Sequence, residues 1–340
     1  MPRPDVELLG VSYRRMPILS IGRDVYLDTR LIIKKLESLF PPSAAHPGIS
    51  SAHALISLTP SSEKEETLLR VKAAEHTALE QLLSDRVIDG DVFRCGAQCF
   101  SASVPKDESF VRDRAALVGI DMSKPGAISP FAPEVIASQV PGARVSLGRW
   151  IRWLEEGLLA DGRDWILDSN SNIGPSLADL EAVWVLYWVY GVPGGLPTEI
   201  LGPESAPKVY AWIRRFDEAV KRAEAEQKRD APPRRLSGDE AAKLIAGSPF
   251  AEPDAEEVSS HWPFDPVVKA EGLSKGVPVK MWPTDYGSSY RDRGTLVLID
   301  DLEFIIEAKG GAYGSVRIHA PRHGFKVARD KSSDVPSSSL

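Results

Sequence analysis

Features that assign a chain to several common protein classes are scarce or missing here. The 340 residues contain only two cysteines, Cys95 and Cys99, which is too few for a disulfide framework. The longest apolar run, at 182–192, is too short to cross a bilayer, and the N-terminus has no apolar leader. These features exclude a disulfide-rich secreted domain. They favour a cytoplasmic protein without a membrane partner.

An excess of positive charge is also missing. The chain has 41 Lys and Arg against 48 Asp and Glu, so its net charge is −7 at pH 7. This balance argues against nucleic acid or an anionic membrane as the main partner. The apolar fraction of 43% is ordinary for a globular protein, and the length allows about two or three domains.

A proline inside an early strand pattern is the first positive signal. Residues 13–22 have the composition of a strand that Pro17 interrupts. Residues 23–27 have the composition of a second strand, and residues 28–37 have the composition of a helix. Proline removes a donor from the strand ladder. If the Met16–Pro17 bond is cis, the N–H and C=O of Met16 turn outward and can bind an extended peptide. We predict a cis bond here.

Asp28 and Thr29 stand where the predicted helix begins. N–H groups in a first helical turn attract a carboxylate, an interaction worth about 0.3–1 kcal/mol, and Asp28 can accept a hydrogen bond from an ammonium group. Together with Met16 and Pro17, these residues suit a ligand with a peptide backbone and an α-amino-acid end, and glutathione is such a ligand. The structural alternative is an edge strand followed by an Asp N-cap.

The remaining patterns are helical and then extended. Helices are predicted at 65–85, 107–118, 132–139, 145–159, 180–190 and 208–225. Ser176 and Asp179 form a capping box before an almost wholly apolar helix, which predicts a buried helix start. A second capping box, from Ser237 to Glu240, predicts the start of a short helix that ends at Gly247. Short alternating strands after residue 263 predict a five-stranded, SH3-like barrel, and the tail is predicted to be disordered.

This order of signals resembles the glutathione S-transferases, in particular a fungal group with an extra C-terminal β module. The resemblance is carried by Met16-Pro17, Asp28-Thr29, Ser176 to Asp179, the Pro-x-x-x-x-Trp run 207–212 and the stretch 282–322. It implies an α+β multidomain fold. The expected parts are a partial thioredoxin-like β-β-α segment that binds glutathione (1–40), a linker (41–64), an all-helical domain (65–226), a linker with a short helix (227–249), a small β-barrel (250–328) and a disordered tail (329–340).

The resemblance further implies glutathione as co-substrate, no metal, a small apolar electrophile and a homodimer. The family's catalytic Tyr, Ser or Cys lies in a strand–helix–strand segment that precedes the first matched strand. We therefore expect no catalytic residue in this chain, and little conjugation of glutathione by it as written. Two functions stay open. One is conjugation or isomerisation of an electrophilic metabolite in fungal secondary metabolism or detoxification, and the other is a noncatalytic role in binding a ligand or a partner.

Other chemically active residues have simpler structural explanations. Cys95 and Cys99 are expected to be buried and structural, and the six histidines show no metal-ligand spacing. His76 falls on an apolar helical face, which predicts a core or cleft residue. Arg14 and Arg15 either meet the glycyl carboxylate of glutathione or are simply exposed. Four tryptophans either line an apolar cleft or, as expected for most of them, pack in a helical core: Trp150, Trp153, Trp184 and Trp188.

Overall fold

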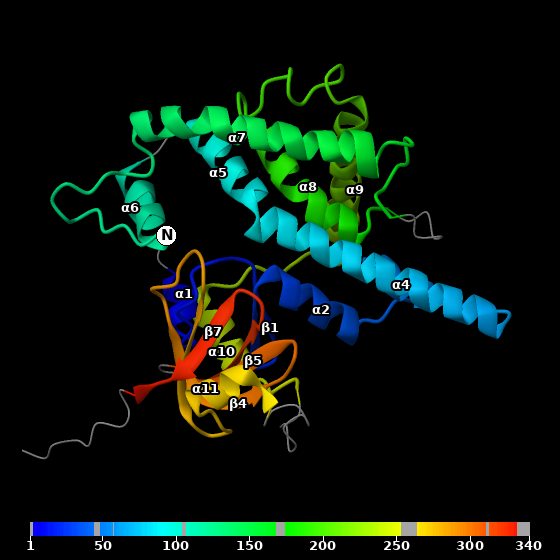
Figure 1. Ribbon diagram of the computed structural model, residues 1–340. Helices are drawn as coiled ribbons and strands as arrows, with labels where there is room; N and C mark the ends of the chain where they lie inside the picture. The colour runs from blue at the N-terminus through cyan, green and yellow to red at the C-terminus, as the bar shows by residue number, and fades with distance from the viewer. Residues whose placement is uncertain are drawn as a thin grey trace, which may run out of the picture. The chain divides into compact units, whose positions relative to one another are not determined.

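Strands from the two ends of the chain share one β-sheet (Figure 1). The computed structural model describes residues 3–43, 48–56, 58–103, 107–167, 174–252, 264–310 and 313–331. The strands are β1 (Ile18–Ile21), β2 (Asp24–Leu27), β3 (Pro278–Pro283), β4 (Asp292–Ile299), β5 (Glu303–Gly310), β6 (Gly314–Pro321) and β7 (Phe325–Arg329). Their order is β1-β2-β6-β5-β4-β3-β7. The β2–β6 pair is parallel, and the other neighbouring pairs are antiparallel.

The short strand β2 explains why the two ends come together. All four of its residues are buried. Val25 and Leu27 enter the core formed with the C-terminal strands, whereas Tyr26 packs on the other side against Leu31 and Ile32 of α2 (Thr29–Leu39). A strand that is buried on both faces needs a neighbour on each edge and a layer on each side. The β1–β2 hairpin supplies only one edge, and β6 supplies the other.

The expected separation into a partial thioredoxin-like segment and an independent barrel is therefore not what the structure contains. Five strands do follow residue 263, as predicted, but they continue into the β1–β2 hairpin as one sheet. Two strands and one helix cannot bury enough apolar surface on their own, which is the physical reason for the merger. The compact unit that contains this sheet comprises residues 1–36, 107–129 and 234–340.

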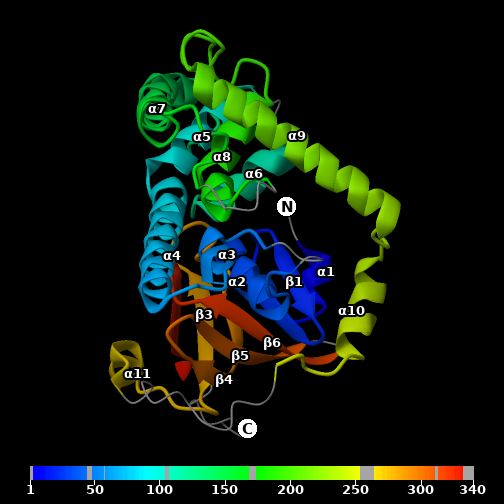
Figure 2. The same ribbon diagram turned by 90° about the vertical axis from the view of Figure 1, so that its right-hand side faces the viewer.

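Short helices accompany the sheet in this first unit. They are α1 (Pro4–Glu7), the first part of α2, α6 (Glu108–Leu117), α10 (Gly238–Ala246) and α11 (Pro266–Glu271). Figure 2 shows α10 beside α1, and a Cβ atom added to Gly238 of α10 would lie 2.1 Å from Asp5 of α1. The predicted capping box of α10 is present: the Ser237 hydroxyl accepts from Glu240 N–H, and the Glu240 carboxylate accepts from Ser237 N–H. This box is exposed to solvent.

The second unit, residues 37–106 and 130–233, is helical. Its α-helices are α3 (Ser51–Ile56), α4 (Glu63–Ser84), α5 (Asp91–Ser103), α7 (Pro133–Trp153), α8 (Leu177–Tyr190) and α9 (Pro207–Asp230). Two π-helical segments, Asp85–Asp89 and Leu154–Leu158, directly follow α4 and α7. None of the described helices combines the length and apolar character needed to cross a membrane.

The buried start of α8 agrees with the prediction from sequence. The Ser176 hydroxyl accepts from Asp179 N–H, and the Asp179 carboxylate accepts from Ser176 N–H at 2.9 Å. The same carboxylate also accepts from Ile166 N–H and from the Trp212 indole N–H, both at 2.8 Å. Asp179 thereby joins the start of α8, the chain before it and α9. It satisfies buried donors that water cannot reach.

Three boundaries differ from those expected. The helices predicted at 132–139 and 145–159 are one helix, α7, which continues through Pro141 although an interior proline lacks the N–H of the regular hydrogen-bond pattern. The expected linker 41–64 contains α3, whose Ser51 is buried and bonded to Glu80. The helix α9 continues to Asp230, with exposed ion pairs such as Lys228–Glu224 at its end. Residues 332–340 of the predicted tail lie outside the described residues.

Candidate functional site

The Met16–Pro17 peptide bond is cis, as predicted. Met16 is 69% exposed, and its thioether sulfur lies 3.0 Å from an Arg3 Nη1 atom. Within the described residues, the backbone N–H and C=O of Met16 have no protein partner. These two groups are therefore available to a ligand directly before strand β1.

Asp28 occupies the position before the first turn of α2. Its φ of +70° is the left-handed conformation, which aspartate and asparagine tolerate better than most residues. The Asp28 Oδ1 atom accepts from Arg30 N–H at 3.1 Å, so the carboxylate caps the helix. The helix begins at Thr29, one residue after the predicted start, and Thr29 is exposed.

Arg15 adds a positive charge between two carboxylates. Its Nη1 atom lies 2.9 Å from Asp285 Oδ2, and its Nη2 atom lies 4.0 Å from Asp28 Oδ2. The guanidinium also lies over the rings of Tyr13 and Phe325, at 5.3 and 5.8 Å from their centroids. Asp285 follows β3, and sequence reasoning missed it because nothing local links it to the N-terminal residues.

The buried residue Asp292 accepts a hydrogen bond from the segment that precedes Pro17. This residue begins β4, is 1% exposed, and its Oδ1 atom accepts from Ser12 N–H at 2.5 Å. Burial raises the pKa of the Asp292 carboxyl to about 7. The neighbouring Arg14 turns away from the candidate site, because it pairs with Asp113 and lies over the Tyr290 ring. Of the two arginines considered from sequence, Arg15 alone reaches Asp28 within the described residues.

The candidate site thus combines three kinds of binding group: a free backbone pair at Met16, an acid–arginine–acid row of Asp28, Arg15 and Asp285, and the N-terminus of α2. Such a row can bind an ammonium group on its carboxylates and a carboxylate on its guanidinium. The main chain of a free α-amino acid carries both groups, a positive ammonium and a negative carboxylate. The geometry therefore fits a peptide-like ligand with a free α-amino-acid end.

A second group of ionisable residues lies at the face of the sheet next to α2, and sequence reasoning did not find it. His319 of β6 is fully buried between two carboxylates, with Nε2 at 2.9 Å from Asp24 Oδ1 and Nδ1 at 2.9 Å from Glu303 Oε2. Lys35 of α2 contacts Glu303 at 2.6 Å and Glu252 at 2.5 Å. We call these five residues the buried ionic cluster. It joins β2, β5, β6, α2 and the chain after α10.

The buried ionic cluster has the chemistry of a structural element. Both ring nitrogens of His319 face carboxylates, so both can donate only if the ring is an imidazolium. Burial alone would lower the pKa of His319, but the hydrogen bonds to Asp24 and Glu303 raise it above its ordinary value. Glu252, Glu303 and His319 are of metal-ligand type and lie close together. The Lys35 ammonium already contacts both glutamates, so a protein cation supplies the compensating charge.

The other residues considered from sequence have structural surroundings. Cys95 and Cys99 are free and buried in the helical core, and burial raises the pKa of both thiols, that of Cys99 to about 11. His76 is buried and hydrogen-bonded to the Ser51 hydroxyl at 2.9 Å. His53 is bonded to Glu37 at 2.9 Å, whereas His46 and His261 lie outside the described residues.

The four tryptophans take different positions in the helical unit. Trp150 is 3% exposed and belongs to the core, whereas Trp153 is 50% exposed, with the guanidinium groups of Arg86 and Arg149 over its ring. Trp184 and Trp188 are partly buried and pack against aromatic rings of α5, Trp188 at 4.2 Å between ring centroids from Phe100. Core packing, the expected role for most of them, accounts for three of the four.

Comparison with known proteins agrees with this fold. A crystal structure of a GST-like protein from Pseudomonas syringae is similar over 97% of this chain and 86% of that chain, with a TM-score of 0.56 and 19% sequence identity. A family model described as a domain of unknown function (DUF7962) matches residues 97–225. No curated protein sequence matches the chain. The similarity defines the class: this is a protein of mixed α+β structure with a glutathione S-transferase-like fold.

Proposed function

We propose that the chain binds glutathione at Met16, Pro17, Asp28 and Thr29, with Arg15 and Asp285 completing the site. The observation that carries this proposal is the free backbone pair of Met16 in the same unit as the acid–arginine–acid row. In this proposal the cysteinyl backbone of glutathione pairs with Met16. Its γ-glutamyl ammonium lies on the two carboxylates, and the γ-glutamyl carboxylate lies near Arg15 and the first turn of α2.

The proposed role is that of a cytosolic glutathione S-transferase-like protein that acts on a small electrophilic metabolite, as the fungal resemblance implies. Catalysis of this kind requires a donor that lowers the pKa of the glutathione thiol. The described site contains charged groups for the two ends of the peptide, and the phenol of Tyr13 is buried with its pKa raised. A noncatalytic glutathione-binding protein is therefore the second candidate. Conjugation of glutathione to a generic electrophile, measured beside binding, separates the two.

The charge of Asp28 is the part of the site most open to test. Asp28→Asn keeps a hydrogen-bond acceptor for Arg30 N–H and tolerates the positive φ, but it removes the negative charge. We expect glutathione affinity, measured by titration calorimetry, to fall at least about tenfold, since an ion pair with the ligand's ammonium is lost.

Asp301→Asn is the matched control, because Asp301 is an exposed aspartate at the turn before β5 of the same sheet. It should leave the affinity within about twofold. Equal binding by wild type and Asp28→Asn would place the glutathione site elsewhere. Binding without turnover would favour the noncatalytic candidate.

A homodimer is part of the same proposal and is supported by α4. Its Leu68, Val71 and Leu82 are exposed, although Ala73, His76 and Leu83 on the same helix are buried. Leu68 and Val71 lie one helical turn apart, and large apolar side chains exposed together are typical of an interaction surface. We expect sedimentation velocity to show a dimer for the wild type and a monomer for Leu68→Asp with Val71→Asp. A wild-type monomer at micromolar concentration would contradict the dimer.

A further inference from the structure

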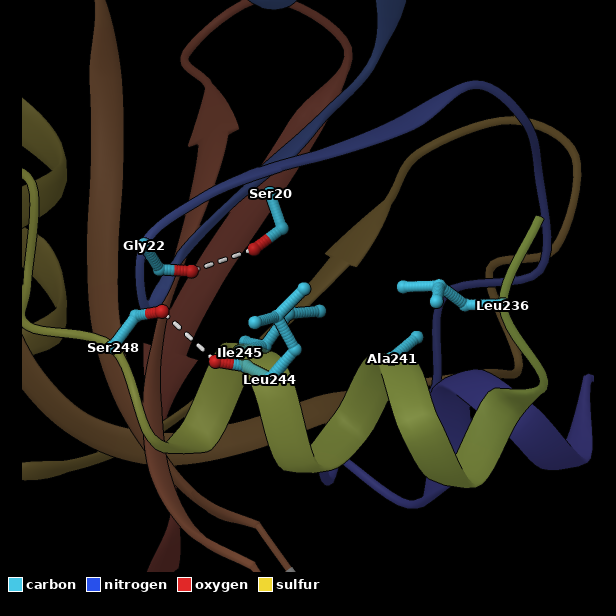
Figure 3. A pocket seen from close by; sticks show the side chains of 7 residues that line it. All are labelled: Ser20, Gly22, Leu236, Ala241, Leu244, Ile245 and Ser248. Carbon is cyan, nitrogen blue, oxygen red and sulfur yellow. Dashed lines mark hydrogen bonds between the residues drawn. The ribbon is translucent and has the colours of Figure 1, made fainter. Parts of the chain in front are cut away.

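A hollow of about 260 Å³ lies between strand β1 and helix α10 (Figure 3). Ser20 and the following turn form one wall, and Leu236, Ala241, Leu244 and Ile245 form much of the other. The described residues that line it carry no charged side chain, and Leu244 is 61% exposed at its mouth. The hollow therefore offers an uncharged, largely apolar surface that is open to solvent.

Within the described part of the chain, strand β1 lies at the end of the sheet, so one of its edges has no strand partner. Its described strand partner is β2, and the β2 register covers all of Ile18–Ile21. Beyond β1, Gly22 forms an isolated bridge with Phe250, and Arg23 N–H donates to the Pro249 carbonyl at 3.1 Å. These contacts occupy the edge at the C-terminal end of β1, at residues 22 and 23. Alternate residues of β1, whose N–H and C=O groups face away from β2, stay available for main-chain pairing.

The side chains of β1 alternate between two environments. Leu19 and Ile21 pack with Tyr26 and the residues of α2, whereas Ser20 lines the hollow next to α10. A strand added beside β1 alternates in the same way, because neighbouring strands share their faces. Every second side chain of such a strand would point toward the hollow. The edge and the hollow together therefore form one binding groove, which we call the β1–α10 groove.

We propose that the β1–α10 groove binds an extended peptide segment, which pairs with Ile18–Ile21 and places one large, uncharged apolar side chain in the hollow. The free edge supplies main-chain affinity, and the uncharged lining excludes an acidic or basic side chain at that position. A second copy of this chain is a poorer occupant. A stable dimer buries roughly 1,200 Å² or more, which four strand residues and one hollow do not provide.

This inference does not depend on glutathione binding, and the experiment keeps the two apart. The probe is a fluorescein-labelled heptapeptide that alternates threonine and valine, with leucine at its centre. Binding is measured by fluorescence anisotropy. The control peptide has the same composition with N-methylated amides at alternate positions, which removes strand donors but keeps the side chains. The protein variants are Leu244→Asp, at the mouth of the hollow, and Leu302→Asp. Leu302 is a leucine of similar exposure (54%) in the same unit and is not among the residues that line the hollow.

We expect saturable binding of the probe by the wild type and by Leu302→Asp. Leu244→Asp and the N-methylated peptide should each weaken binding at least tenfold. Hydrogen exchange of residues 18–21 should slow in the presence of the probe, and glutathione or Asp28→Asn should leave its affinity unchanged. Because Leu244 and Leu302 are both exposed, circular dichroism should show both variants folded. No binding up to 1 mM probe, equal binding of the N-methylated peptide, or displacement by glutathione would overturn the proposal.

Discussion

Replacing His319 with glutamine is expected to lower the free energy of unfolding by about 3–5 kcal/mol, the range for breaking a buried ion pair by removing one partner. The substitution keeps polar atoms near Asp24 and Glu303 but removes the positive charge between them. Both carboxylates have almost no exposed side-chain surface, so water cannot replace the imidazolium. Urea unfolding followed by circular dichroism measures the loss, and hydrogen exchange of 316–321 reports on the sheet itself.

Lys326→Gln is the matched control, because it removes a positive charge from an exposed position on β7 of the same sheet. Its expected effect is within about 0.5 kcal/mol. Adding Asp24→Asn to His319→Gln should cost less than Asp24→Asn costs alone, since the uncompensated carboxylate is then gone. A loss below about 1 kcal/mol for His319→Gln would mean that the buried ionic cluster does not hold the two ends of the chain together.

The same cluster predicts how stability depends on pH. The folded-state pKa of His319 is raised, so its contribution is fully present below the unfolded value of about 6.5 and is lost as pH rises through the folded value. The pKa values of Asp24 and Glu303 would be raised by burial alone. Their hydrogen bonds to His319 and other groups lower both. Their contributions are present above about pH 4 and are lost as pH falls. The difference between wild type and His319→Gln should therefore be largest between about pH 4.5 and 6.5.

Replacing Asp179 with alanine is the second large effect expected, a loss of about 3–5 kcal/mol. The carboxylate accepts from Ser176, from Ile166 N–H and from the Trp212 indole, and the two last donors would be left without a partner inside the helical core. Each unsatisfied buried donor costs about 1–3 kcal/mol. Ser176→Ala removes only the cap and should cost about 0.5–2 kcal/mol. Thermal and urea unfolding of both variants gives the two values.

The exposed capping box of α10 provides the control for this comparison. Glu240→Ala removes the residue at the same position of the same motif, but its hydrogen-bond partner Ser237 lies at the surface. We expect a loss of no more than about 1 kcal/mol there. Glutathione affinity per folded molecule should not change in Asp179→Ala, because Asp179 belongs to the helical unit. Equal losses in the free energy of unfolding for Asp179→Ala and Glu240→Ala would show that burial does not increase the contribution of a capping box to stability.

Several local features of this structure could be predicted from the sequence, because they depend on interactions between nearby residues. The cis bond before Pro17, the start of α2 at Thr29 and the capping boxes at Ser176 and Ser237 each depend on residues a few positions apart. The apolar composition of α8 likewise identified the buried helix. Signals of this kind are readable because the interacting groups are neighbours in the chain.

Only the tertiary structure decided how the two ends combine. The pairing of β2 with β6 joins residues 24–26 to 317–319, and no pattern within either segment specifies that partner. Asp285 beside Arg15, and His319 between Asp24 and Glu303, were invisible for the same reason. Their side chains meet because a strand buried on both faces must find a neighbour for its open edge, and the charges they carry are stable inside only when paired there.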